Sequence, residues 1–168
     1  MKRDNTVGRQ TNSKSDLAYI AGFFDGDGSL MVQFKNRRDR PKGWRIMFTL
    51  CFYQDTRHEK PLFWIRRRLG IGYISRRNDG ITELRINGYE RAKDILENLY
   101  PYIRFKRKQA QITLKILNIV VGKKFQEIRR KIRLRIADMI YEMRSYQYQS
   151  GWKKKSISHK ELRKRLGF

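Results

Sequence analysis

Two carboxylates lie on either side of a single glycine in the stretch LAYIAGFFDGDGSL, residues 17–30. They belong to Asp25 and Asp27, and a mainly apolar run precedes them. Carboxylates this close repel one another, and a bound divalent cation relieves the repulsion. Hard oxygen ligands near phosphate suit Mg²⁺, which takes few protein carboxylates and completes its shell with water and phosphate oxygens. This pair is therefore a candidate metal site.

Two other interpretations of the same residues stay open. Asp and Gly are both common turn residues, so the DGDG segment is also typical of a tight turn. The segment resembles the start of a calcium-binding loop as well. The remaining ligand spacing and the terminal glutamate of such a loop are missing, however.

Small residues recur every fourth position along the same stretch, at Ala18, Gly22 and Gly26. On a helix they form a stripe with almost no side chains, along which a second helix can approach closely. Because the chain contains one copy of the stripe, the simplest partner is a second copy of the same protein on a two-fold axis. We expect a homodimer whose contacts include Ala18, Ala21, Gly22 and Asp25.

The charge of the chain indicates a polyanionic partner. Forty Lys and Arg residues against sixteen Asp and Glu leave a formal net charge of +24 over 168 residues. Such a chain repels itself unless it meets a polyanion, so nucleic acid is the favoured partner. A generic basic surface and attraction to an anionic membrane are the alternatives.

Several features argue against other classes of protein. The single cysteine, Cys51, excludes an internal disulfide framework and a zinc site built from cysteines. The first ten residues are polar and charged, so we expect no signal peptide. The apolar runs are shorter than a membrane span requires. We therefore expect a soluble, intracellular, basic protein whose partner is nucleic acid and not a membrane.

Apolar periodicity predicts the elements that position the candidate residues. A helical spacing begins near Ser15, with Ser13 or Ser15 as the N-cap, and Gly26 and Gly28 end the helix. Alternating apolar residues predict two pairs of strands, the second pair joined by an Asn-Asp-Gly turn at 78–80. These strands cover 30–35, 45–53, 72–77 and 82–87.

Further helices are predicted by apolar residues at helical spacing. They cover 61–69, 89–99, 109–121 and a long amphipathic segment with apolar positions from 125 to 143. Ser158 and Glu161 resemble a capping box for a short last helix. The order of elements predicts an α+β fold with one four-stranded antiparallel sheet, the fold we expect for this chain.

The chain divides into three parts on composition. We expect a flexible N-terminal arm at 1–13, one folded domain at 14–145 and a basic extension at 146–168. Two interpretations of the extension stay open, because it either contacts DNA backbone beyond the sheet or is a solvated tail.

One face of the predicted sheet is apolar, and the other carries long polar side chains that can reach base edges in a major groove. Arg and Lys suit guanine, Gln suits adenine and Glu accepts from cytosine. An ordinary solvated sheet face is the alternative. With the basic loop between the first two strands, the expected DNA contacts are Ser29, Met31, Gln33, Lys35, Arg37, Arg38, Arg40, Arg45, Met47, Thr49, Ser75, Arg77, Glu83 and Arg85.

The segment LAYIAGFFDGDGS resembles the signature of the LAGLIDADG homing endonucleases, in particular the single-motif members that act as homodimers. Two further segments, LGIGYISRR and YPYIRFKRKQAQITLKIL, follow in the order and spacing of that family. The resemblance covers about Leu17 to Val121. Beyond it, the C-terminal quarter matches the family only in being helical and basic.

The resemblance implies roles for individual residues. Asp27 matches the catalytic metal ligand of the family, and Gly26 matches a residue whose backbone carbonyl also binds metal. Gln54 corresponds to a polar residue that orders water near the metals, and Lys106 corresponds to a basic residue of the same pocket. His58 departs from the pattern, because many relatives have Arg or Lys there and histidine is charged only when protonated.

The implied activity is cleavage of double-stranded DNA at a long, pseudo-palindromic site. Mg²⁺-dependent phosphodiester hydrolysis would leave short 3′ overhangs, and Mn²⁺ or Ca²⁺ are other expected occupants of the metal sites. Such proteins are encoded within introns and act in archaeal or bacterial cytoplasm or in eukaryotic organelles. An RNA maturase or a DNA-binding regulator on the same fold, without cleavage, is the alternative function.

Overall fold

The computed structural model describes residues 12–36, 44–124, 127–146 and 158–166. Its four strands form one antiparallel sheet in the order β1-β2-β4-β3, as the sequence predicted. The strands are β1 (Gly28–Asn36), β2 (Trp44–Asp55), β3 (Tyr73–Arg76) and β4 (Ile81–Asn87). The helices are α1 (Lys14–Asp27), α2 (Lys60–Leu69), α3 (Tyr89–Leu99), α4 (Arg107–Val120), α5 (Arg130–Ser145) and α6 (His159–Arg165), with a 3₁₀ turn η1 at Thr56–His58.

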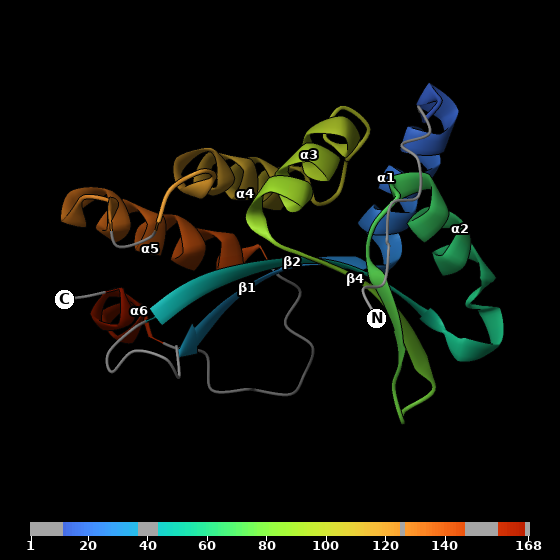
Figure 1. Cartoon of the computed structure of the whole chain (residues 1–168), viewed down its shortest axis with the longest axis horizontal. Coiled ribbons are helices and arrows are strands. Elements are labelled where there is room, and N and C mark those ends of the chain that lie inside the picture. The colour runs from blue at the N-terminus through green and yellow to red at the C-terminus, as the bar shows by residue number, and fades with distance from the viewer. Residues whose placement is uncertain (1–11, 37–43, 125–126, 147–157, 167–168) are drawn as a thin grey trace, which may run out of the picture.

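Helices α1 to α5 lie on one side of the sheet, and no helix of the described residues covers the opposite side of the strands (Figure 1). We call this uncovered side the open face. Strand alternation turns Leu30, Leu50 and Leu84 toward the helices, where each is at most 6 % exposed. The predicted turn between β3 and β4 is also present, since Arg77 N–H donates to the Ile81 carbonyl over 2.8 Å.

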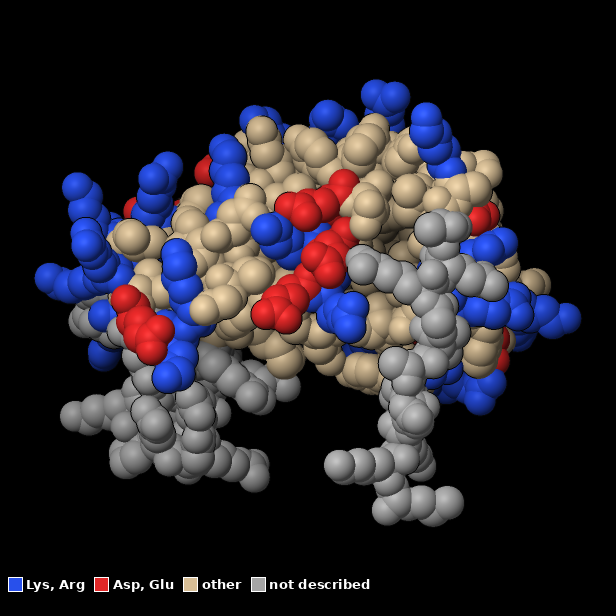
Figure 2. All heavy atoms as spheres, turned by 45° about the horizontal axis from the view of Figure 1, so that its top comes forward, with Lys and Arg blue, Asp and Glu red and all other residues tan. Residues whose placement is uncertain are grey.

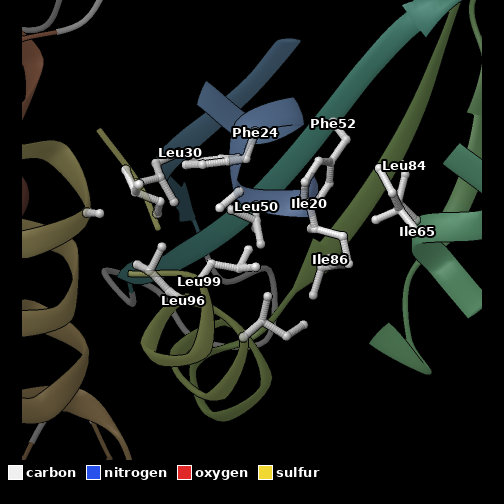
Figure 3. Packing of buried hydrophobic residues seen from close by; sticks show 14 of the residues in the cluster. Ile20, Phe24, Leu30, Leu50, Phe52, Ile65, Leu84, Ile86, Leu96 and Leu99 are labelled. Atoms are coloured by element: carbon white, nitrogen blue, oxygen red, sulfur yellow. The ribbon is translucent and has the colours of Figure 1, made fainter. Parts of the chain in front are cut away.

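The first core cluster joins α1 to the middle of the sheet (Figure 3). Ile20 and Phe24 from α1 meet Phe52 of β2, and the rings of Phe24 and Phe52 pack edge to face with centroids 5.8 Å apart. Each of these side chains is fully buried. Burying one of them contributes about 1.5–3 kcal/mol. This packing fixes where the C-terminal end of α1 lies relative to β2.

The second core cluster joins α4, α5 and α6 to the first part of β2. Ile116, Ile136 and Leu162 are fully buried there, and Leu166 is 1 % exposed. The last helix is therefore packed on the folded domain, although the sequence placed it in a separate extension. The rest of that extension, at 147–157 and 167–168, and the predicted arm at 1–11 lie outside the described residues.

Helix ends show where periodicity located boundaries well and where it did not. Ser13, one of the two predicted caps, accepts a hydrogen bond from Asp16 N–H at 3.1 Å and begins α1. The last helix begins at the predicted cap Ser158. By contrast, α5 starts at Arg130, and the buried Ile128 precedes it, because apolar spacing continued through a non-helical segment. Position 125 lies outside the described residues.

The described helices do not include one with both the length and the apolar character needed to cross a membrane.

Candidate active site

The carboxylate of Asp25 is fully engaged by its own chain. It accepts hydrogen bonds from three successive backbone N–H groups at the start of α4, from Arg104 at 2.6 Å, Phe105 at 3.0 Å and Lys106 at 2.9 Å. These contacts join segments about eighty residues apart in the sequence. Hydrogen bonds to an ionised acceptor are stronger than neutral ones. Asp25 therefore clamps the end of α1 to the loop before α4, and its expected place among the dimer contacts stays a prediction.

Asp27 behaves differently. It is the last residue of α1 and it is exposed. Among the described residues, none donates a hydrogen bond to its carboxylate. The turn of the helix accounts for the contrast with Asp25, since two residues correspond to a rotation of about 200°. One acid faces the chain, and the other faces outward.

The chain ends α1 abruptly after Asp27 because of the residue that follows. A Cβ on Gly28 would lie 2.6 Å from the carbonyl oxygen of Phe24, so any larger residue displaces the backbone. Gly28 adopts an extended conformation and opens β1 directly. The predicted role of Gly28 in ending the helix is thus confirmed, whereas Gly26, also expected to end it, lies within α1. Gly28 holds Asp27 at the junction of α1 and the sheet.

Lys106 places a cation beside these acids. Its Nζ donates to the backbone carbonyl of Asp25 and, at 3.5 Å, to that of Gly26. It also lies over the rings of Phe24 and Phe105, at 5.8 and 5.2 Å from their centroids. Burial lowers the pKa of the Lys106 ammonium, and the negative charges of Asp25 and Asp27 act in the opposite direction. Lys106, which the resemblance assigned to the pocket of the metal ligands, thus lies at the end of α1.

The end of α1 suits a hard cation with few protein ligands. The described residues do not include a cluster of three or more His, Cys, Asp or Glu side chains that could enclose a metal ion. One chain instead offers the exposed carboxylate of Asp27 and the neighbouring carbonyl of Gly26. Mg²⁺ is held in this way in many proteins, by one or two carboxylates together with water and phosphate oxygens.

Gln54 lies near the end of β2, two residues beyond Phe52, which pairs with Gly28. This register brings the end of β2 alongside the junction of α1 and β1. The Gln54 Oε1 accepts from the Asp55 N–H at 2.8 Å, which leaves the side-chain NH₂ as the donor of this residue. His58, the residue that departs from the family pattern, is exposed at the end of η1.

The predicted small-residue stripe is open. Ala18, Gly22 and Gly26 are exposed, and a Cβ added at either glycine would meet no atom within 4 Å. The prediction for Ala21 is wrong, because this residue is fully buried in the core of its own chain. It lies one position from Ile20 on the helix, on the face that packs against the sheet.

The register places the predicted DNA-contacting positions together on the open face. Ser29 lies opposite Cys51, Met31 opposite Thr49, and Ser75 opposite Glu83. Further pairs in the backbone register are Gln33 with Met47, Lys35 with Arg45, and Cys51 with Arg85. Arg37, Arg38 and Arg40 lie outside the described residues.

Two of the predicted DNA contacts are buried, contrary to expectation. Thr49 and Glu83 are each 3 % exposed. The Thr49 hydroxyl donates to Asn87 Oδ1 at 2.7 Å, and the Glu83 carboxylate is ion-paired with Arg77 at 3.0 Å and Arg85 at 2.5 Å. Neither residue presents a free polar atom to a base. Glu83 instead fixes two arginines that are more exposed.

Sequence reasoning missed Tyr53 on the same face. Its hydroxyl is hydrogen-bonded with Ser29 Oγ at 2.9 Å and donates to Met31 Sδ at 3.9 Å. Burial raises the pKa of Tyr53 to about 12, so the phenol stays protonated. The alternation that identified Arg45, Met47 and Thr49 continues to this residue, and that signal could have found it.

Positive charge is not confined to the open face. Figure 2 looks onto the side of the helices, where Lys and Arg side chains stand over much of the surface and Asp and Glu gather near its middle. Charge alone therefore does not locate a binding site. The candidate site is identified instead from the end of α1 and from the polar residues of the open face.

Comparison with known proteins gives consistent matches. A protein-family model described as LAGLIDADG endonuclease matches residues 20–120. The DNA endonuclease I-CvuI of Chlorella vulgaris is 35 % identical over 101 residues, which cover 60 % of this chain and 63 % of that protein. The DNA endonuclease I-CreI of Chlamydomonas reinhardtii is 30 % identical over 105 residues, which cover 62 % and 64 %. Each match thus spans just under two thirds of the relative.

Similarity of structure extends further along the chain. The homing endonuclease I-CvuI, crystallised in complex with the I-CreI target in the presence of Mg, has a TM-score of 0.76 at 27 % identity, covering 91 % of this chain and 93 % of that chain. The archaeal intron-encoded homing endonuclease I-Vdi141I, in complex with DNA, has a TM-score of 0.74 at 19 % identity over 92 % and 96 %. The second likeness concerns the fold alone.

Proposed function

Because this chain belongs to the LAGLIDADG endonuclease family, we propose that it is a homing endonuclease that hydrolyses both strands of duplex DNA at a specific site. The observation that carries this proposal is the different placement of two neighbouring acids. Asp25 is held by three N–H groups, whereas Asp27 is exposed beside the ammonium of Lys106. An unengaged carboxylate next to a cation suits binding of a metal ion and a phosphate.

The metal in this proposal is Mg²⁺, held by the Asp27 carboxylate and the Gly26 carbonyl. When bound, the Mg²⁺ ion would acidify a water molecule and stabilise the leaving oxygen. Mn²⁺ and Ca²⁺ take similar oxygen ligands, and we expect them to occupy the same place.

The chain's own residues orient the reacting groups. The Lys106 ammonium, fixed by the Asp25 carbonyl, offsets negative charge that develops on the phosphate. The Gln54 side-chain NH₂, at the end of β2, orients the attacking water. Asp25 takes no part in the chemistry, and its clamp keeps Lys106 in place.

We propose that the active protein is a homodimer that pairs through the α1 stripe of Ala18, Gly22 and Gly26. Packing along that stripe brings the Asp27 residues of both subunits to a common two-fold axis. Two such sites across a minor groove cut opposite strands and leave short 3′ overhangs, as in the family. A two-fold symmetric protein reads a pseudo-palindromic site, one half for each subunit.

Recognition of the half-site is assigned to the open face. Arg77 and Arg85, held by Glu83, are donors suited to guanine edges, and Met31 and Met47 suit the methyl group of thymine. The phosphate backbone supplies most of the affinity through the high positive charge of the chain.

The proposal is tested by digestion of genomic DNA from a host strain without the intervening element. Digestion with Mg²⁺ is followed by sequencing of all new ends, with EDTA and with the Asp27→Asn variant in parallel. We expect a few reproducible staggered cuts that vanish in both controls. Salt-sensitive DNA binding without any cut would contradict cleavage and favour a regulator, and preferential RNA binding would favour a maturase.

A further inference from the structure

The turn that follows β2 carries an arginine held by a neighbouring carboxylate. Asp55 accepts three hydrogen bonds from Arg57, from the backbone N–H at 2.8 Å, from Nε at 3.0 Å and from Nη2 at 2.7 Å. The Arg57 side chain is nevertheless 82 % exposed. The guanidinium is therefore fixed in orientation while facing solvent.

The backbone of this turn is itself anchored to the sheet. Thr56 N–H donates to the Gly80 carbonyl at 2.8 Å, which ties η1 to the turn between β3 and β4. The Thr56 and Thr82 hydroxyls lie 3.0 Å apart, and Thr82 donates to Glu59 at 2.6 Å. Thr82 is fully buried. These contacts hold Arg57 at one place relative to the strands.

That place adjoins the proposed active site. Asp55 directly follows Gln54, and its backbone N–H donates to the Gln54 Oε1, so the Gln54 side chain is held against the backbone of this turn. The alternation of β2 places Asp55 on the same face as Tyr53, the open face. Phe52 pairs with Gly28, so this end of β2 runs past the junction next to Asp27.

We propose that Arg57 contacts a DNA phosphate next to the bond that is cut, and that Asp55 is the positioning residue that aims its guanidinium. This inference rests on the proposed function. Arginine suits the role because its planar fork binds a carboxylate along one edge and has further N–H donors for a phosphate. Arg57 thereby supplies the permanent charge that His58, the next residue, does not carry.

The ion pair persists over the working range of pH. Three hydrogen bonds from Arg57 hold the pKa of the Asp55 carboxyl well below its usual range, and Asp55 raises the pKa of Arg57. Both groups therefore remain ionised in neutral solution, and the orientation of the guanidinium does not depend on a proton.

The test measures binding of a duplex that contains the cleavage site, in EDTA, over a range of salt concentrations. Arg57→Gln is compared with Arg67→Gln, which removes the same charge from an exposed position on α2. Loss of one phosphate contact in each subunit lowers the slope of log Kd against log salt by about 1.8, at about 0.9 for each contact. The slope of the Arg67→Gln protein should match that of the wild type.

Two further variants separate positioning from charge. Arg57→Lys keeps the charge and the salt slope but loses the planar fork, so kcat/KM falls while DNA binding is retained. Asp55→Asn leaves Arg57 charged without its ionic partner, and we expect a lower kcat with little change in melting temperature.

Equal slopes for Arg57→Gln and Arg67→Gln, with both proteins folded by circular dichroism, would overturn this inference and leave the proposed function standing. Absence of any cut by the wild-type protein in the genomic digestion would instead overturn the proposed function, and this inference with it.

Discussion

The end of α1 and the open face of the sheet use carboxylates in opposite ways. Asp27 at the end of α1 is exposed, and none of the described residues donates a hydrogen bond to it. Glu83 on the open face is 3 % exposed and lies between Arg77 and Arg85. An unpaired carboxylate at the surface is ready to bind a cation, whereas a buried, paired one orients its partners. Exposure and pairing, and not residue type, separate the two functions.

Asp25 and Asp27 show the same contrast between a bound and an exposed carboxylate at a single helix end. Asp25 belongs to the same four-residue DGDG segment as Asp27, yet its carboxylate is taken up by the N–H groups of residues 104–106. One acid of this helix end therefore holds two segments together, and the other is the proposed metal ligand. We therefore expect substitutions at α1 and on the open face to have different effects.

The largest effect is expected from Gly22→Leu, which alters only the pairing of α1. The added side chain enters open space in the monomer and improves helix propensity by about 1 kcal/mol, so each subunit stays folded. It blocks close approach of a second α1. Because linked half-sites gain 10²–10⁴ in avidity, DNA affinity should fall roughly a hundred-fold or more and cleavage should be lost.

Sedimentation velocity and filter binding measure this outcome, with Arg67→Leu on α2 as a control for an added exposed leucine. A dimeric Gly22→Leu protein that still cuts DNA would show that the subunits do not pair through the α1 stripe.

A smaller effect is expected from Asp25→Ala, which removes the clamp without touching the open face. Loss of hydrogen bonds to a charged, partly exposed acceptor should cost about 2 kcal/mol. For a chain of this size, that corresponds to a fall in Tm of roughly 4–8 °C. Differential scanning calorimetry checks this, and Asp25→Asn, which keeps one acceptor oxygen, should lose less. An unchanged Tm would mean that the clamp does not stabilise the fold.

The smallest effect is expected from Glu83→Gln on the open face. Both arginines keep their charge, but Arg85 loses its carboxylate partner Glu83 and Arg77 is left with Asp79 alone, so base discrimination weakens by about 1 kcal/mol at the positions they read. Cleavage of a library of single-base variants of the target measures the change. Glu90→Gln removes the same charge from an exposed position on α3, and it should leave the pattern of cleavage across the library unchanged. Identical cleavage patterns for the two variants would show that Glu83 has no part in base recognition.

Local patterns in the sequence predicted most of the fold. Alternation located β1, β2 and β4, and the face that Ser29, Met31 and Ser75 share follows from that alternation together with the register. The same alternation did not reveal that Thr49 and Glu83 are buried, because their surroundings come from Asn87, Arg77 and Arg85 on other segments.

The candidate site was predictable only in part, for a related reason. The DGDG segment and its helix can be identified from adjacent residues. The contacts that distinguish Asp25 from Asp27 come from residues about eighty positions away, which no local pattern contains. Ala21 was misplaced because small residues fit both an interface and a crowded core, and only packing against the sheet decides between them.

The most direct measurement compares Asp27→Asn with Asp25→Asn on the recovered target duplex, by single-turnover cleavage and by Tm in the same buffer with Mg²⁺. We expect Asp27→Asn to keep the wild-type Tm and make no cut, and Asp25→Asn to melt lower and still cut at temperatures where it is folded. Cleavage by Asp27→Asn at the wild-type rate, or loss of cleavage by a folded Asp25→Asn protein, would contradict the assignment of the two acids.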